Sequence, residues 1–294
     1  MHATALMFIS LLGLAQAHPV RRALTDPQVL NFALTLEHLE SAFYDQVLSR
    51  FSPADFSSAG FPDWARGRFK QIQAHEASHV TFLTTALTAA GAKAVDSCQY
   101  NFGITDVSSA VAVSASLEAV GSAAYTGAAQ YINDKNYLTA AASILGTETR
   151  HAGWIASAVL HGSAWDTAYQ TALSPSQVYH IASTFIKSCP SSNSALLPSL
   201  ASFSPLTVTN AQPGKTATVK FSAPKDSPSQ LFVAFISGVG APLFVPVRDG
   251  KVQVPSALAR TGTVFCVITK DGGRADDDTI IAGPAVVQFP FGSS

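Results

Sequence analysis

The chain contains five glutamates, all between residues 37 and 148, and four of them form a pattern with tyrosine and histidine that occurs twice. In each copy a glutamate precedes a tyrosine by seven residues, and a later glutamate precedes a histidine by three. The pairs are Glu37 with Tyr44, Glu76 with His79, Glu118 with Tyr125 and Glu148 with His151. Glutamate that served only solubility would be scattered along the chain, so we infer a chemical role for this set.

These side chains fit a pair of metal ions bridged by carboxylates inside a four-helix bundle. Two helices each contribute one glutamate, and two contribute Glu-x-x-His, whose two members share a helix face. Four carboxylates balance two divalent cations, two neutral imidazoles each add a nitrogen, and open positions remain for oxygen, peroxide or water. The predicted ligands are Glu37, Glu76, His79, Glu118, Glu148 and His151. Such oxygen-rich sets accept iron and manganese alike, so two Fe or two Mn ions are expected.

Each of these residues, taken singly, has a simpler explanation, such as a surface pair on a helix. Around Glu118, however, the sequence carries almost no other charge and the neighbours one turn away are small. A lone buried carboxylate is costly unless it is paired or coordinates a metal, which favours the metal interpretation. His38 and His75 are adjacent in sequence to predicted ligands and point about 100° away from them, so they are expected on the rim or the surface.

Three further residues are predicted to support the ligands. Tyr44 and Tyr125 lie two helical turns beyond Glu37 and Glu118, where each could orient a carboxylate by a hydrogen bond or serve as an ordinary core tyrosine. Glu40 lies one turn after Glu37 and could be the ligand in its place, or an outer partner. The spacing to tyrosine favours Glu37, because only that choice makes the two copies match.

Capping residues, prolines and glycines place the pattern on four long helices. These are expected over residues 26 to 50, 62 to 90, 106 to 133 and 136 to 161, with a shorter fifth helix over 174 to 188 and a loop over 51 to 60. The third and fourth are rich in alanine, which permits close helix approach. The repeat predicts two helical hairpins that meet about a pseudo-two-fold axis, in a bundle domain over residues 25–190.

The composition changes after residue 190. Residues 191–204 have the composition of a linker, and residues 205–291 read as short β-branched and aromatic runs separated by turn residues. Seven strands are expected, near 206–209, 216–221, 231–236, 243–247, 251–254, 263–269 and 286–289. This predicts an α + β two-domain protein with a small immunoglobulin-like β-sandwich. The acidic run over residues 276–278 could bind a cation or form a solvated turn.

Composition and the first residues limit the function class. With 13% charged residues and a net charge of -1, the chain lacks the basic face of a nucleic-acid-binding protein. Residues 1–17 read as a secretory signal, and Arg21-Arg22 is either a processing site that ends a pro-peptide at residue 22 or an ordinary basic pair. No membrane span is expected, because the longest apolar helices carry the glutamates.

Three cysteines are expected to form one disulfide and one free thiol in an oxidising compartment. Cys98 and Cys189 lie in polar, loop-like surroundings and are predicted to pair. Cys266 lies in a buried-strand pattern, where a thiol behaves as a small apolar residue.

The segments around the glutamates, residues 30–44, 75–79 and 140–151, resemble the ferritin-like domain of secreted fungal stress proteins, a group similar to plant and bacterial desiccation-related proteins. The resemblance covers roughly residues 25–190. It implies the same six ligands, with Glu76 and Glu148 bridging and Glu37 and Glu118 terminal. The wider superfamily includes ferroxidases, rubrerythrins, manganese catalases and di-iron oxygenases, so the resemblance specifies a centre rather than a substrate.

Two functions are expected from these observations. The first is an extracellular oxidoreductase that consumes peroxide or oxygen, as a catalase-like or peroxidase-like enzyme, or that oxidises Fe²⁺. The second is a non-catalytic secreted or cell-wall-associated stress protein, whose sandwich contacts cell-wall carbohydrate or protein.

Overall fold

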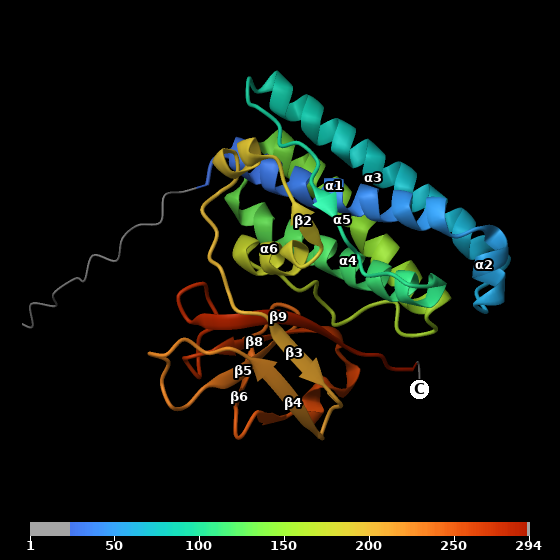
Figure 1. The fold of residues 1–294 in the computed structure, drawn as a ribbon. Coiled ribbons are helices and arrows are strands. Elements are labelled where there is room, and N and C mark those ends of the chain that lie inside the picture. The colour runs from blue at the N-terminus through green and yellow to red at the C-terminus, as the bar shows by residue number, and fades with distance from the viewer. Residues whose placement is uncertain (1–23, 293–294) are drawn as a thin grey trace, which may run out of the picture.

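The computed structural model describes residues 24–292, so the predicted signal and processing segments lie outside the described residues. The chain forms a helical bundle followed by two β-sheets (Figure 1). The helices are α1 (Asp26–Arg50), α2 (Pro53–Ser58), α3 (Asp63–Ala89), α4 (Val107–Ala128), α5 (Lys135–Trp154) and α6 (Pro175–Ser183), with short 3₁₀ turns at Ala129–Tyr131, Ser191–Ala195 and Ser256–Arg260 and a π-helical turn at Ile155–Val159. The strands are β1 (Gln99–Tyr100), β2 (Ile186–Ser188), β3 (Leu206–Thr209), β4 (Thr216–Phe221), β5 (Phe232–Ile236), β6 (Leu243–Pro246), β7 (Lys251–Gln253), β8 (Gly262–Thr269) and β9 (Ile280–Phe289).

The four long helices begin and end close to the predicted residues, and they pack as two hairpins, α1 with α3 and α4 with α5. Local capping explains their starts. The side chain of Asp106 accepts a hydrogen bond from the backbone of Ser109 at 2.7 Å, and that of Asp134 accepts one from Asn136 at 2.7 Å. Residues Val107–Tyr131, which comprise α4 and the 3₁₀ turn after it, are long and apolar enough to cross a membrane by length and composition alone, a criterion that a buried core helix also meets. Within the fold, 72% of their apolar window is buried.

Two predictions about short segments were wrong. Residues 51–60 do not form a plain loop, because Ser52 caps a six-residue helix, α2, through a reciprocal hydrogen bond with Asp55. The fifth helix ends at Ser183 instead of Ser188, since residues 186–188 pair as strand β2 with β1. The predicted disulfide between Cys98 and Cys189 is confirmed at the edge of this small sheet.

The C-terminal strands form two antiparallel sheets, in the orders β3-β4-β7 and β6-β5-β8-β9, consistent with the predicted immunoglobulin-like sandwich. All seven predicted strands are present, although β9 begins six residues earlier than expected. Every residue of β8 is buried. Val264, Cys266 and Ile268 face the other sheet, whereas Phe265 and Val267 join the core of the bundle. The continuous apolar run of this strand is therefore explained by burial on both faces.

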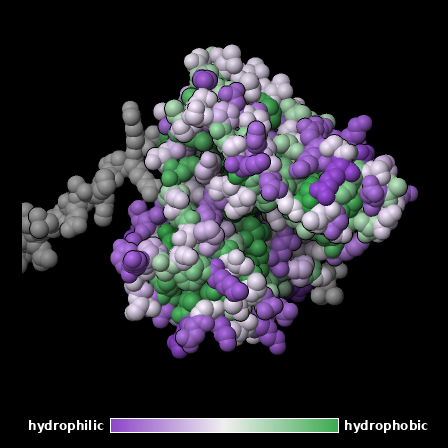
Figure 2. All heavy atoms as spheres, viewed as in Figure 1, coloured by the Kyte–Doolittle hydropathy of each residue, from purple (hydrophilic) through white to green (hydrophobic). Residues whose placement is uncertain are grey.

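The β region packs against the bundle through α6, which lies beside β9 (Figure 1). The acidic run contributes to this contact. Asp277 accepts hydrogen bonds from Ser174 and Ser176 at 3.0 and 2.7 Å, and Asp276 pairs with Arg274 at 2.6 Å. These acidic groups are thus engaged by the protein itself. On the face shown in Figure 2, polar side chains are spread over both parts and hydrophobic ones gather where they meet.

Candidate metal centre

The bundle brings the six predicted ligands together from four helices. Helix α1 carries Glu37, α3 carries Glu76 and His79, α4 carries Glu118, and α5 carries Glu148 and His151. The four glutamates are fully buried, with 0% exposure each. Burial of four carboxylates in one place is strongly unfavourable unless cations or protons compensate them.

The ligand atoms form two overlapping groups, and within each group they lie within 4.8 Å of one another. One group, called here the His79 position, consists of Glu37, Glu76, His79 and Glu148. The other, called the His151 position, consists of Glu76, Glu118, Glu148 and His151. Each position has three carboxylates and one imidazole, and the two share Glu76 and Glu148. This is the arrangement that two neighbouring cations with two common carboxylates require.

The two tyrosines connect the hairpins. Tyr125 on α4 donates a hydrogen bond to Glu37 on α1 at 2.5 Å, and Tyr44 on α1 donates one to Glu118 on α4. Each tyrosine therefore orients a glutamate of the other helix rather than the one on its own helix. The pairs are crossed because α1 and α4 run antiparallel, so the tyrosine of each helix lies beside the glutamate of the other.

Glu40 is buried next to the centre but belongs to neither ligand group. Its carboxylate lies over Gly121 of α4 together with that of Glu148. A Cβ atom on Gly121 would stand 2.8 Å from Oε1 of Glu40 and 2.9 Å from Oε2 of Glu148. The missing side chain of this glycine provides the space in which the two carboxylates approach each other.

The pKa values show how the protein compensates these buried acids with protons. Burial raises the pKa of Glu37 to about 7, despite hydrogen bonds from His79 and Tyr125 that oppose it. Burial likewise raises the pKa of Glu118, Glu148 and Glu40, those of the last two to well above the usual range. The neighbouring carboxylates raise the pKa of Glu40 and Glu148 further.

The pKa values of the two histidines are raised, although burial alone would lower them. Burial favours the neutral rings, but hydrogen bonds to the carboxylates outweigh it and raise the pKa of His79 to about 10 and that of His151 to about 9. The same contacts overcome the effect of burial on Glu76 and lower its pKa to about 2. Protons thus occupy the places where cations would compensate the acids, and a divalent cation would have to displace them.

Three carboxylate oxygens in the centre accept no hydrogen bond of normal geometry in the described part of the chain: Oε1 of Glu76 and both oxygens of Glu148. Nδ1 of His151 lies 3.2 Å from Oε1 of Glu76, and Nδ1 of His79 lies 3.4 Å from Oε1 of Glu148, both at ion-pair distance. These are the two glutamates common to both positions. Buried acceptors without a partner are rare in native proteins and usually indicate an ion or water. The donor set of carboxylate and imidazole also suits iron or manganese. The residues present therefore fit a metal centre.

His75 has a contact that its position in the sequence did not predict. This side chain is exposed, as expected, but its Nδ1 lies 2.9 Å from Nε2 of His151, and the two rings lie nearly in one plane, with an angle of 9° and centroids 5.2 Å apart. His38 instead contacts the backbone oxygen of Val95 at 3.3 Å, away from the centre. The only sequence signal for His75 is its place one residue before Glu76, which by itself does not indicate contact with another helix.

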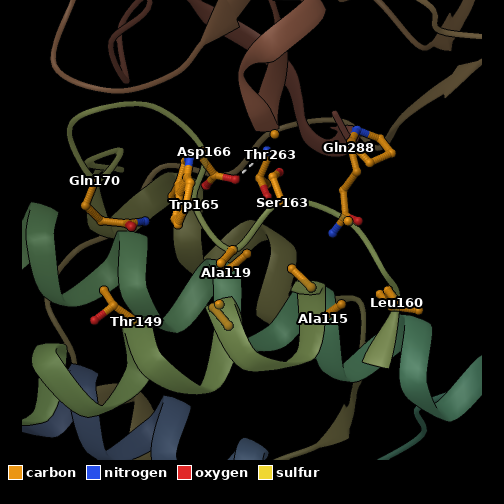
Figure 3. Close-up of a pocket in the computed structure, with 17 residues that line it drawn as sticks. Ala115, Ala119, Thr149, Leu160, Ser163, Trp165, Asp166, Gln170, Thr263 and Gln288 are labelled. Atoms are coloured by element: carbon orange, nitrogen blue, oxygen red, sulfur yellow. Dashed lines mark hydrogen bonds between the residues drawn. The ribbon is translucent and has the colours of Figure 1, made fainter. Parts of the chain in front are cut away.

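A separate cavity of about 140 Å³ lies where the helices meet the β region (Figure 3). Its floor is made of small residues of α4 and of the end of α5, including Ala115 and Ala119. Asp166 accepts a hydrogen bond from the backbone of Thr263 at 2.7 Å, which attaches the loop after α5 to β8. The buried glutamates do not line this cavity, so it is distinct from the candidate metal centre.

Comparison with known proteins agrees with this geometry. The profile of the ferritin-like domain family matches residues 25–161, which contain all six predicted ligands. The comparison with curated proteins finds no match. Residues 25–161 thus form a ferritin-like domain with a buried glutamate and histidine cluster that could hold metal, and a β-sheet region follows it.

Proposed function

We propose that the ferritin-like domain binds two iron or two manganese ions and uses them in redox chemistry with peroxide or oxygen, or to oxidise Fe²⁺, in a secreted, stress-related protein. The observation that carries this proposal is the set of three buried oxygens on Glu76 and Glu148 that accept no hydrogen bond of normal geometry and lie among the other ligand atoms. Structural polar clusters normally satisfy their buried oxygens within the protein. The disulfide supports secretion, because such bonds persist in oxidising compartments.

Each residue has a definite task under this proposal. Glu76 and Glu148 belong to both positions and would bridge the ions, whereas Glu37 and Glu118 would each bind one. Tyr125 and Tyr44 hold these two terminal glutamates by hydrogen bonds. Two metals held by these residues would supply the redox chemistry, exchanging electrons with the small oxidant or with Fe²⁺.

The protein also controls water and protons at this site. The four ligand glutamates are inaccessible to solvent, so bulk water is excluded from the carboxylate side. His79 and His151 must each lose a proton before Nδ1 can act as a ligand, because their pKa values of about 10 and 9 keep them charged near neutral pH.

A peroxide-consumption and Fe²⁺-oxidation assay on the metal-loaded full chain tests the proposal. We expect turnover in the natural protein and its loss in Glu118→Ala, which removes a ligand of one position. Equal activity in the two proteins contradicts the redox role. Bound metal without turnover of peroxide, oxygen or Fe²⁺ contradicts it as well, and leaves a metal-binding protein.

A further inference from the structure

The two halves of the centre are related by a repeat that extends beyond the ligands. Aligning Glu37 with Glu118 also aligns Tyr44 with Tyr125, and aligning Glu76 with Glu148 aligns His79 with His151. The ligand groups follow the same symmetry, with one imidazole and three carboxylates each. A difference between the two metal positions must therefore arise from residues outside the six ligands.

The two copies differ at several positions next to the ligands, and at two of these a side chain of one copy lies against a ligand on α5. His75, which precedes Glu76, corresponds to Thr147, which precedes Glu148. Glu40, three residues after Glu37, corresponds to Gly121, three residues after Glu118. In both cases the residue of the first copy reaches α5: His75 contacts His151, and Glu40 lies beside Glu148.

The contact of His75 with His151 has a defined direction. Nδ1 of His151 faces the carboxylates, at 3.2 Å from both Glu76 and Glu118. When Nδ1 is a metal ligand, a neutral ring carries its proton on Nε2, and this proton can be donated only outward. Nδ1 of His75, at 2.9 Å, is the acceptor in that direction. A hydrogen bond of this kind fixes the ring and makes its ligand nitrogen more basic.

His79 has no equivalent support. Its Nδ1 faces Glu37 and Glu76 at 3.2 and 3.1 Å, and its Nε2 makes no hydrogen bond to any other residue between 24 and 292. The residue equivalent to His75, Thr147, directs its hydroxyl to the backbone oxygen of Ser143 in its own helix at 3.4 Å. The imidazole of the His79 position is therefore held only from the side of the carboxylates.

We propose that the two metal positions are inequivalent, and that the His151 position binds its metal more tightly and fills first because His75 holds its imidazole. Glu40 also breaks the symmetry of the repeat, since Gly121 offers no counterpart, but it lies beside Glu148, which both positions share, and so favours neither position by itself. This inference rests on the metal binding proposed above, and it does not depend on the redox chemistry. His75 acts as a positioning residue, since it contacts His151 and none of the ligand oxygens.

Calorimetric titration of the metal-free full chain with Mn²⁺, and with Co²⁺ while its visible spectrum is followed, tests the proposal. We expect two binding steps in the natural protein. His75→Phe should weaken the tighter step about 10- to 100-fold, the range for loss of a partner that orients a ligand, and bring the two steps together. His75→Asn, whose amide oxygen can replace Nδ1 as acceptor, should restore the separation. Thr147→Val, at the equivalent place, should leave both steps unchanged.

The outcomes separate this inference from the proposed function. A single step with two equal sites in the natural protein overturns the inequivalence and leaves the metal centre standing. Two steps that His75→Phe does not alter overturn the role of His75. Absence of binding by either metal overturns the metal centre itself. Circular dichroism of each variant confirms that lost affinity does not reflect lost fold.

Discussion

Tyr44 of α1 donates its phenolic hydrogen to Glu118 of α4, a residue 74 positions away in the sequence. The repeat supplies the same contact in reverse, from Tyr125 to Glu37. The two bonds close a ring between α1 and α4 in the middle of the bundle. They hold the two glutamates that are not shared by both ligand groups, and so determine where these carboxylates can bind.

Removal of either hydroxyl should therefore affect both stability and metal affinity. Tyr44→Phe leaves Glu118 without this donor, which should lower the free energy of unfolding of the metal-free protein by about 1–3 kcal/mol. Metal affinity should fall about 10-fold or more, as for other partners that orient ligands. Urea denaturation and metal titration measure the two effects. Tyr137→Phe is the control, because that hydroxyl makes no hydrogen bond within residues 24–292; an equal loss in the control would contradict the account.

A methyl group at Gly121 should damage the centre even though it favours the helix. Alanine at a helical glycine usually adds about 0.4–1 kcal/mol of stability. At Gly121 the added Cβ would lie under 3 Å from the carboxylates of Glu40 and Glu148 and force them apart. We expect Gly121→Ala to bind less metal, as measured by elemental analysis.

Gly146→Ala on α5 is the matched control for this effect, because nothing lies within 4 Å of the Cβ it would add. It should keep its full metal content and unfold at the same or a higher denaturant concentration. If both variants retain metal equally, the close approach of Glu40 to Glu148 has no bearing on binding.

The pKa shifts predict that the metal-free protein loses stability as the pH rises. The pKa values of His79 and His151 are raised from the ordinary 6.5 to about 10 and about 9. The stabilising effect of these residues is therefore complete below pH 6.5 and is lost as the pH rises through about 9 to 10. The pKa of Glu37 is raised from 4.5 to about 7, so the stabilising effect of this residue also disappears as the pH rises through that range. The pKa of Glu76 is lowered to about 2, so this residue makes the protein more stable as the pH rises, but only below pH 4.5.

The free energy of unfolding should accordingly fall between about pH 5 and pH 10 in the metal-free protein, and fall much less in the metal-loaded one. Metal addition near neutral pH should release protons from both histidines, which a weakly buffered titration with a pH indicator detects. Stability that rises over this range in the metal-free protein would show that the protons are held elsewhere.

The disulfide should stabilise the bundle without forming part of the centre. It joins Cys98 to Cys189, which are 91 residues apart. Closing a loop of this length in the unfolded chain stabilises the folded state by about 4–5 kcal/mol. Replacing both cysteines by serine should lower the free energy of unfolding by about 2–5 kcal/mol, with metal content unchanged. Loss of metal from a variant that is still folded would instead place the small β1–β2 sheet among the supports of the centre.

Much of the site was predictable because its ligands follow helical periodicity. Glu76 and His79 share a face at three residues, and a charge-poor helix made Glu118 conspicuous. The space above Gly121 was not predictable, since it depends on which face of α4 meets Glu40. The contact of His75 with His151 was not predictable for the same reason. It joins α3 to α5, and residue spacing within one helix carries no information about contacts between helices.

The fold shows the same division between local and long-range information. Strand β8 was recognisable from its apolar run, and the starts of the long helices from their capping residues. Strands β1 and β2 have only two and three residues and depend on pairing between distant segments. Helix α2 was within reach of the sequence, because Ser52, Pro53 and Asp55 have the spacing of a helix start.

Elemental analysis of the purified full chain, together with its Glu148→Ala variant, tests the central claim most directly. Glu148 belongs to both ligand positions, so its removal should affect both metals at once. The account predicts two iron or two manganese ions per natural chain and nearly none in the folded variant. A natural protein that retains no metal after exposure to either ion, or a variant that retains the full content, would contradict it.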